Sequence, residues 1–211
     1  MKIRRINNEL EINQEEDTVL VLGYFDGLHK GHQTLFKEAR KIATEQGLKI
    51  AVLTFPESPK LAFVRYQPEL MLHLNHPEER AAHLENLGVD YLYLIDFTSH
   101  FSKNTAREFF DKYVSALKAK AVVAGFDYHF GSDKRKAEEL ADYFDGRIVI
   151  VSSVNQDDEK ISSTRIRETI QNGDVAKAHQ LLGYPLSTRG IVVHGNARGR
   201  TIGYPTANLA P

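Results

Sequence analysis

The sequence predicts an α/β fold built on a doubly wound, Rossmann-like parallel sheet. Short apolar segments alternate with stretches of helical period along most of the chain. The apolar segments are hydrophobic almost without interruption, which is typical of strands covered by helices on both faces. Ligands of such sheets bind beyond the carboxyl ends of the strands, so we expect the functional residues in the loops there.

Each element is placed by its own pattern. The predicted strands are Val19–Gly23, Lys49–Phe55, Asp90–Asp96, Ala119–Gly125 and Arg147–Ser153. The predicted helices are Lys30–Gln46, Pro77–Gly88, Thr105–Leu117, Lys134–Phe144, Ser163–Asn172 and Asp174–Leu182. Proline in a first turn and glycine at a helix end support these boundaries, as at Pro77, Gly47 and Gly88.

The character of the chain changes near Gly183–Leu186. From there on it has β-branched residues with glycine and proline, and no helical period. We place a domain boundary here, with residues 1–184 as the first domain and residues 185–211 as the incomplete start of a second. About 25 residues cannot bury a hydrophobic core alone.

Composition limits the classes of function. Hydrophobic residues make up 42% and charged residues 26% of the chain, as in ordinary soluble proteins. A formal net charge of −1 gives no global basic field for nucleic acid. The absence of cysteine removes disulfides, thiolate metal sites and cysteine nucleophiles. With no signal-peptide pattern and no bilayer-length apolar run, we expect a cytoplasmic protein without membrane partners.

The first motif is GYFDGLHKGH, Gly23–His32, which follows a predicted strand and opens a predicted helix. A helix N-terminus offers free N–H groups and partial positive charge to a phosphate. His29 and His32 are three residues apart and share a helix face, so both could donate to one phosphate. Three glycines allow tight turns and close approach of a ligand: Gly23, Gly27 and Gly31. The alternative is a glycine turn with two surface histidines; zinc lacks an obvious third ligand, and the loop is not a Walker A motif.

The second motif is ISSTRIR, Ile161–Arg167. Its hydroxyl residues are good helix N-caps: Ser162, Ser163 and Thr164. Arg165 and Arg167 add fixed positive charge at a helix start, where an anion is already favoured. The motif is therefore either a second phosphate clamp or simply a well-capped helix.

The third motif is AGFDYHFGSDKRK, Ala124–Lys136, at the end of the fourth predicted strand. Its position favours a ligand loop containing Gly125, Asp127 and Gly131. Three aromatic residues follow a period of two: Phe126, Tyr128 and Phe130. They could contact a ligand or be one buried face of an extended strand, and the sequence leaves both readings open.

Taken in order, these motifs resemble the bacterial bifunctional riboflavin kinase/FAD synthetase family. The segment Gly199–Leu209 is similar to the opening of the riboflavin kinase domain, and the resemblance runs from about Val19 to Leu209. It implies a nucleotidyltransferase domain followed by the start of a β-barrel kinase domain. The implied reaction is FMN plus ATP giving FAD plus pyrophosphate, with Mg²⁺ neutralising the triphosphate and no covalent enzyme intermediate.

The resemblance also implies roles for single residues. The catalytic set is His29, His32, Asp127 and Arg167, with the histidines on the transferring phosphate and Asp127 near nucleotide and metal. The binding set is Gly23, Phe25, Asp26, Gly27, Gly31, Gly125, Ser163, Thr164 and Arg167. In the kinase segment, Thr206 and Asn208 would bind Mg²⁺ and nucleotide.

Some features depart from the family pattern. The family commonly has Asn where this chain has Tyr24, and Pro-His-Pro in the turn where it has Glu57, Ser58 and Pro59. Because the chain ends at Pro211, we expect a fragment that makes FAD from FMN, with riboflavin phosphorylation only in a longer chain. Two alternatives stay open: a nucleotidyltransferase for another phosphorylated acceptor, such as a cytidylyltransferase, or a non-catalytic flavin- or nucleotide-binding module.

Overall fold

The computed structural model of the chain describes residues 1–62, 72–188 and 190–210. Its centre is a six-stranded sheet in the order β1-β4-β3-β2-β5-β8, with every neighbouring pair parallel. The strands are β1 Lys2–Ile6, β2 Thr18–Leu22, β3 Lys49–Thr54, β4 Tyr91–Ile95, β5 Ala119–Gly125 and β8 Arg147–Val151. From β2 the chain winds first toward β3 and β4 and later toward β5 and β8. The strand order therefore reverses beside β2, which is where open parallel sheets bind ligands.

The five predicted strands are confirmed to within one or two residues, and the sheet has one strand more. That strand, β1, was not predicted because its sequence KIRRI carries three cations and only Ile6 is buried. β1 lies at the edge of the sheet and pairs only with β4 along Lys2–Ile6. An edge strand with one end in the core lacks the continuous apolar pattern of the central strands.

The helices that frame the site are confirmed. α1 is Lys30–Gln46, α2 Pro77–Asn86, α4 Ser163–Gln171 and α5 Val175–Leu182. α1 ends at Gly47 in the left-handed conformation with φ +67°, as a glycine C-cap should. Its buried side chains pack on the sheet: Leu35, Phe36, Ala39 and Ile42.

Two helix predictions need correction. In place of a helix Lys134–Phe144, the chain forms β7 Arg135–Lys136, antiparallel to β6 His129–Phe130, and then the 3₁₀ helix η6 Ala137–Asp142. Gly131 and Lys134 adopt positive φ angles in the hairpin turn, which interrupts the helical pattern of the sequence. In place of a single helix Thr105–Leu117 there is α3 Ala106–Phe109, followed by the π-helix η5 Phe110–Val114. Along these two elements four large side chains are buried in the core: Phe109, Phe110, Tyr113 and Val114.

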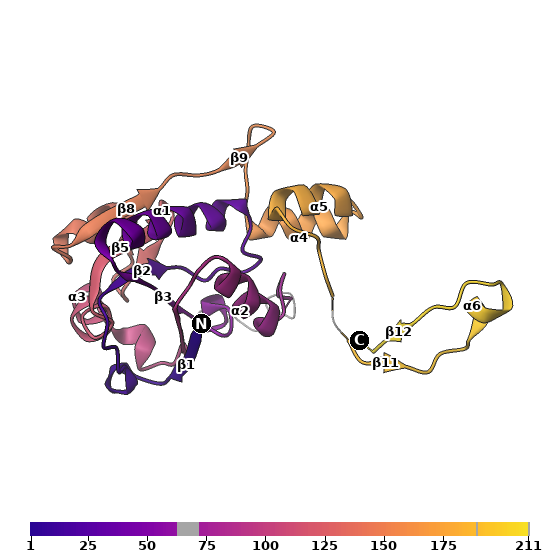
Figure 1. The fold of residues 1–211 in the computed structure, drawn as a ribbon, viewed down its shortest axis with the longest axis horizontal. Coiled ribbons are helices and arrows are strands. Elements are labelled where there is room, and N and C mark those ends of the chain that lie inside the picture. The colour runs from indigo at the N-terminus through magenta and orange to yellow at the C-terminus, as the bar shows by residue number, and fades with distance from the viewer. Residues whose placement is uncertain (63–71, 189, 211) are drawn as a thin grey trace.

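Both faces of the sheet are covered, as a doubly wound fold requires. Along β2, Leu20 and Leu22 belong to one hydrophobic cluster, and Val19 and Val21 belong to the other. α3 and η5 cover the first face and α1 the second (Figure 1). A third cluster joins α4 and α5 to the segment before α2 through Leu74, Ile161, Ile166, Ala178, Leu181 and Leu182.

The remaining short elements are the 3₁₀ helices η1 Glu9–Glu11, η2 Pro59–Ala62 and η4 Phe101–Lys103, and the strands β9 Asn155–Gln156 and β10 Glu159–Lys160. β9 and β10 form a hairpin before α4. In the described ranges, no helix has both the length and the apolar character needed to cross a bilayer.

The C-terminal tail extends away from the sheet domain (Figure 1). It holds β11 Val192–Val193, the short helix α6 Arg198–Thr201 and β12 Asn208–Leu209, with β11 and β12 antiparallel. Large apolar side chains of the tail are exposed, among them Ile191, Ile202 and Tyr204. The hydrophobic clusters of the described residues include none of residues 190–210, and the domain boundary near residue 184 stays a prediction.

Candidate active site

A cavity of about 600 Å³ lies beyond the carboxyl ends of β2, β5 and β8. Its walls include the N-terminal turns of both α1 and α4, which stand apart in sequence and meet here in space. The cavity brings together these predicted site residues: Gly23, Phe25, Asp26, His29, Gly31, His32, Gly125, Asp127, Ser163, Thr164 and Arg167. Gly27 does not line it; with φ +76° this glycine shapes the loop instead. Two helix N-termini in one cavity favour an anionic ligand.

His29 and His32 are placed by the start of α1. His29 is the N-cap, and its Nδ1 accepts a hydrogen bond of 3.3 Å from the backbone N–H of His32. A neutral His29 therefore carries its hydrogen on Nε2. The two rings are stacked, with centroids 3.8 Å apart and planes 16° apart, and Phe25 packs edge-on against His32. The three-residue spacing correctly predicted that the histidines lie together.

Both histidines are held neutral. Burial, with the nearby Lys160 charge, lowers the pKa of His29 to about 4. Burial also lowers the pKa of His32 well below its usual value, and the neighbouring His29 and Lys160 act in the same direction. At pH 7 each ring therefore offers one N–H donor and no charge. Within the described residues, the buried Nδ1 of His32 has no hydrogen-bond partner.

The start of α4 ties the second motif to the first. Ser162 is the N-cap and accepts from the backbone N–H of Arg165, so the capping prediction is confirmed for this serine. The Ser163 hydroxyl donates to the carbonyl of Asp26 at 2.8 Å. Thr164 lines the cavity. This hydrogen bond ties the start of α4 to the loop that precedes α1.

Arg167 forms an ion pair with Asp26, whose side chain is only 4% exposed. Arg167 also donates from Nε to the carbonyl of Leu72 at 3.0 Å, and Asp26 accepts from the backbone N–H of Leu74 at 2.9 Å. Arg167 therefore lines the cavity and at the same time compensates a buried carboxylate. The sequence did not indicate this second task.

Arg165 does not line the cavity, and its guanidinium makes local contacts. Its guanidinium donates to the carbonyls of Gln156 and Glu159 and pairs with the Glu159 carboxylate at 3.0 Å. These contacts hold the β9–β10 hairpin against α4. The sequence left open whether Arg165 binds an anion, and in the structure its donors bond the local hairpin.

Lys160 is the cation that sequence reasoning missed. It lines the cavity, and its Nζ lies 2.5 Å from Asp127 Oδ2 and 4.6 Å from the ring centroid of Phe126. Lys160 belongs to none of the motifs described above. Its position directly before the second motif, which begins at Ile161, was the one feature of the sequence that could have pointed to the cavity. Asp127, which was predicted, thus stands at the cavity as one half of an exposed ion pair.

A second cavity of about 610 Å³ adjoins the first. Residues common to both are Leu22, Gly23, Tyr24, Ser58, Asp127 and Tyr128. Its other walls are strongly aromatic: Phe55, Phe97, Phe101, Phe109 and Phe130. These rings come from segments far apart along the chain, so no local motif could have revealed the cavity.

The three aromatic residues after β5 do not share one environment, so neither a ligand contact nor one buried face describes them all. Phe126 is 39% exposed beside Lys160, whereas Phe130 is buried in the core. Tyr128 and Phe130 are stacked, with centroids 6.1 Å apart, and both line the second cavity. A turn after Gly125 separates Phe126 from the other two rings, so the three do not form one face.

The predicted metal residues of the tail, Thr206 and Asn208, are exposed and line neither cavity. Residues 185–211 contain no Asp or Glu. Across the part of the chain that the structure describes, no three His, Cys, Asp or Glu side chains form a cluster suited to a metal ion. The metal role of these two residues stays a prediction.

Comparison with known proteins gives a consistent family. A model of FAD synthetase matches residues 11–165, and a model of riboflavin kinase matches residues 182–211. Two curated relatives are bifunctional riboflavin kinase/FMN adenylyltransferases. The Listeria monocytogenes protein is 45% identical, and the match covers 90% of this chain and 62% of that protein. The Bacillus subtilis protein is 39% identical, and the match covers 99% of this chain and 67% of that protein. The chain thus spans somewhat under two thirds of the first relative and about two thirds of the second.

A solved structure is also similar throughout. A crystal structure from Streptococcus pneumoniae, described as a macrolide-efflux protein, is 56% identical, with a TM-score of 0.95 over 99% of this chain and 68% of that one. The FAD synthetase match covers most of the chain, including the α1 loop and the start of α4. The chain therefore belongs to the bifunctional riboflavin kinase/FMN adenylyltransferase family and carries its FAD synthetase region.

Proposed function

We propose that the chain transfers AMP from ATP to FMN, giving FAD and pyrophosphate. The observation that supports this most strongly is the pair of adjoining cavities. One is faced by two helix N-termini, as a triphosphate requires, and the other is lined by aromatic rings, as a planar flavin requires. Their shared wall is where the phosphate of FMN would meet the α-phosphate of ATP.

The chemistry needs positioning more than proton transfer. A phosphate oxygen of FMN attacks the α-phosphorus, the bond from that phosphorus to the bridging oxygen breaks, and pyrophosphate leaves. Neutral His29, with its hydrogen on Nε2, would donate to an α-phosphate oxygen, and His32 stacks behind it. Fixed donors aimed at developing charge are a main source of rate acceleration, and each is worth on the order of 10²-fold.

Two cations line the same cavity as the histidines. Arg167 is held by Asp26 and would present its remaining donors to the phosphates. Lys160 is paired with Asp127, and both side chains are substantially exposed, so a triphosphate would compete for the lysine with little desolvation cost. We propose that Lys160 changes partner from carboxylate to phosphate when ATP binds.

Mg²⁺ is part of this proposal. The ion usually binds proteins through one or two carboxylates and takes its other ligands from substrate phosphates and water. Asp127 offers a carboxylate at the cavity wall and fits that role. When bound, Mg²⁺ would neutralise triphosphate charge. We place the reaction in the cytoplasm.

The test is product formation by the whole chain. Incubation with ATP, Mg²⁺ and FMN, followed by chromatography, should show FAD. His32→Ala should form FAD on the order of 10²-fold more slowly, whereas the exposed control His76→Gln should keep the wild-type rate. Riboflavin and a non-flavin phosphate ester serve as alternative acceptors. Transfer of AMP to the ester but not to FMN would favour a different acceptor class. A folded chain that binds ATP and FMN without turnover would favour a binding module.

A further inference from the structure

Tyr24 lies at the wall shared by the two cavities and is held from three sides. Its backbone carbonyl accepts from the Thr54 hydroxyl at 3.0 Å. The guanidinium of Arg80, from α2, lies 5.4 Å from its ring centroid. Its hydroxyl lies 3.0 Å from Nδ1 of His73. An aromatic ring fixed in this way has one orientation at the junction of the cavities.

His73 is itself held by a carboxylate. Its Nε2 lies 2.8 Å from Oε2 of Glu57, so the Nε2 must carry a hydrogen. In the neutral imidazole Nδ1 is then the acceptor, and the Tyr24 hydroxyl donates to it. Burial raises the pKa of Tyr24 to about 12, with the Asp26 charge adding to the effect, so the phenol keeps its proton at neutral pH. The result is a directed chain of hydrogen bonds from Tyr24 through His73 to Glu57.

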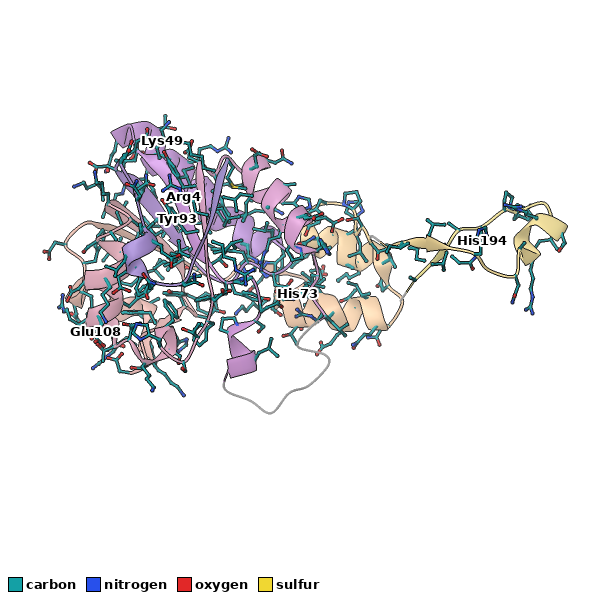
Figure 2. All side chains as sticks on the ribbon, turned by 90° about the horizontal axis from the view of Figure 1, so that it is seen from below. Arg4, Lys49, His73, Tyr93, Glu108 and His194 are labelled. Atoms are coloured by element: carbon teal, nitrogen blue, oxygen red, sulfur yellow. The ribbon has the colours of Figure 1, made fainter. Side chains whose placement is uncertain are left out.

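This chain of hydrogen bonds includes neither the histidine pair nor Lys160 or Arg167, although Arg167 and Asp26 bond the backbone of Leu72 and Leu74 on either side of His73. Figure 2 labels His73 where the sheet domain borders the helices α4 and α5. Tyr24 lines both cavities, whereas His73 and Glu57 line neither.

We propose that Tyr24 contacts the flavin nucleotide where its sugar-alcohol chain passes from the aromatic cavity to the phosphate cavity, and that His73 and Glu57 position the Tyr24 ring. The inference rests on the proposed function, because a ligand with a planar ring at one end and a phosphate at the other must cross this junction. Because Tyr24 lines both cavities, its position would set the width of the passage and therefore the affinity for the acceptor. Tyr24 is a specificity residue in this account, and His73 and Glu57 are positioning residues.

The test separates acceptor binding from ATP binding and from turnover. FMN binding is measured by quenching of flavin fluorescence without ATP, ATP binding by calorimetry, and FAD formation by chromatography. Tyr24→Phe and His73→Leu should each weaken FMN binding and raise KM for FMN about three- to tenfold, the usual effect of one lost neutral hydrogen bond. ATP affinity and kcat should stay within about twofold of wild type.

Two matched controls and one double variant sharpen the test. Tyr93→Phe removes a buried tyrosine hydroxyl that donates to Gln14 in the loop before β2, and Tyr93 is well separated from His73 in Figure 2. His76→Leu removes an exposed histidine at the start of α2, three residues after His73. Both should leave FMN affinity unchanged. The double variant Tyr24→Phe with His73→Leu should lose no more than either single variant, because both remove one contact. Glu57→Gln keeps an acceptor oxygen and should retain most of the affinity that Glu57→Ala loses.

The measured FMN and ATP affinities show whether Tyr24 contacts the flavin nucleotide. Unchanged FMN affinity in Tyr24→Phe and His73→Leu would overturn it. Equal losses of FMN and ATP affinity, together with a lowered Tm, would also overturn it, because they indicate a structural role. If wild type binds FMN and ATP but forms no FAD, the proposed function fails, and the fluorescence titrations still show whether Tyr24 holds the flavin nucleotide.

Discussion

Acidification should destabilise the protein through His29, by an amount that the structure allows to be worked out. The unfolded chain binds a proton at this residue below its ordinary pKa of 6.5, whereas the folded chain does so only near pH 4 because the ring is buried. The contribution of neutral His29 to folding is therefore complete above pH 6.5 and is lost as the pH falls toward 4. Each pH unit in this window costs about 1.4 kcal/mol, so the loss at pH 5 is about 2 kcal/mol.

A matched variant isolates this effect. His29→Asn keeps an oxygen that can accept the backbone N–H of His32 and cap α1, but it does not titrate. Urea unfolding at pH 7 and pH 5 should show that wild type loses about 2 kcal/mol more than His29→Asn over this interval. The exposed control His76→Gln should follow wild type. Parallel pH dependence of wild type and His29→Asn would refute the conclusion that burial holds His29 neutral.

Three further predictions concern single side chains. His32→Ala should lower pyrophosphate release on the order of 10²-fold, and wild-type turnover would argue against its assigned role. Arg167→Ala should lower the free energy of unfolding by about 3 kcal/mol, because it leaves buried Asp26 unpaired, and should weaken ATP binding more than FMN binding in calorimetry. Unchanged ATP affinity would leave Arg167 as a structural partner of Asp26 alone. Tyr184→Phe removes a hydroxyl that donates to the Gly27 carbonyl and contacts Asn75, so a thermal melt should show a loss of about 1–2 kcal/mol, whereas an unchanged Tm would refute the contact.

The parts of the fold that local signals determine were predictable. α1 illustrates this: a glycine loop opens the helix, Gly47 ends it, and its apolar side chains recur at helical period. The strands were predictable because parallel strands buried on both faces are continuously apolar. β1 was not predicted because an edge strand can carry charged residues. The hairpin at Lys134 was not predicted because the sequence there has a helical pattern, which a positive φ angle interrupts.

The candidate site was predictable only where one segment supplies the geometry. His29 and His32 are three residues apart on one helix start, so their proximity follows from their spacing. The aromatic cavity is lined by aromatic residues from four separate segments, and the Lys160–Asp127 pair joins a hairpin to a loop 33 residues away. The Arg165 guanidinium donates to neighbouring backbone carbonyls. The sequence alone could not distinguish these local hydrogen bonds from contacts with a ligand.

The destination of labelled phosphate shows directly whether the chain transfers an adenylyl group to a flavin phosphate. The chain is incubated with FMN, Mg²⁺ and ATP that carries the label either at the α- or at the γ-phosphate. The α-label should appear in FAD in equal amount to the pyrophosphate released, and the γ-label should appear only in pyrophosphate. A γ-label on the flavin, or no α-label in the flavin from a chain whose circular dichroism shows it folded, would contradict the account.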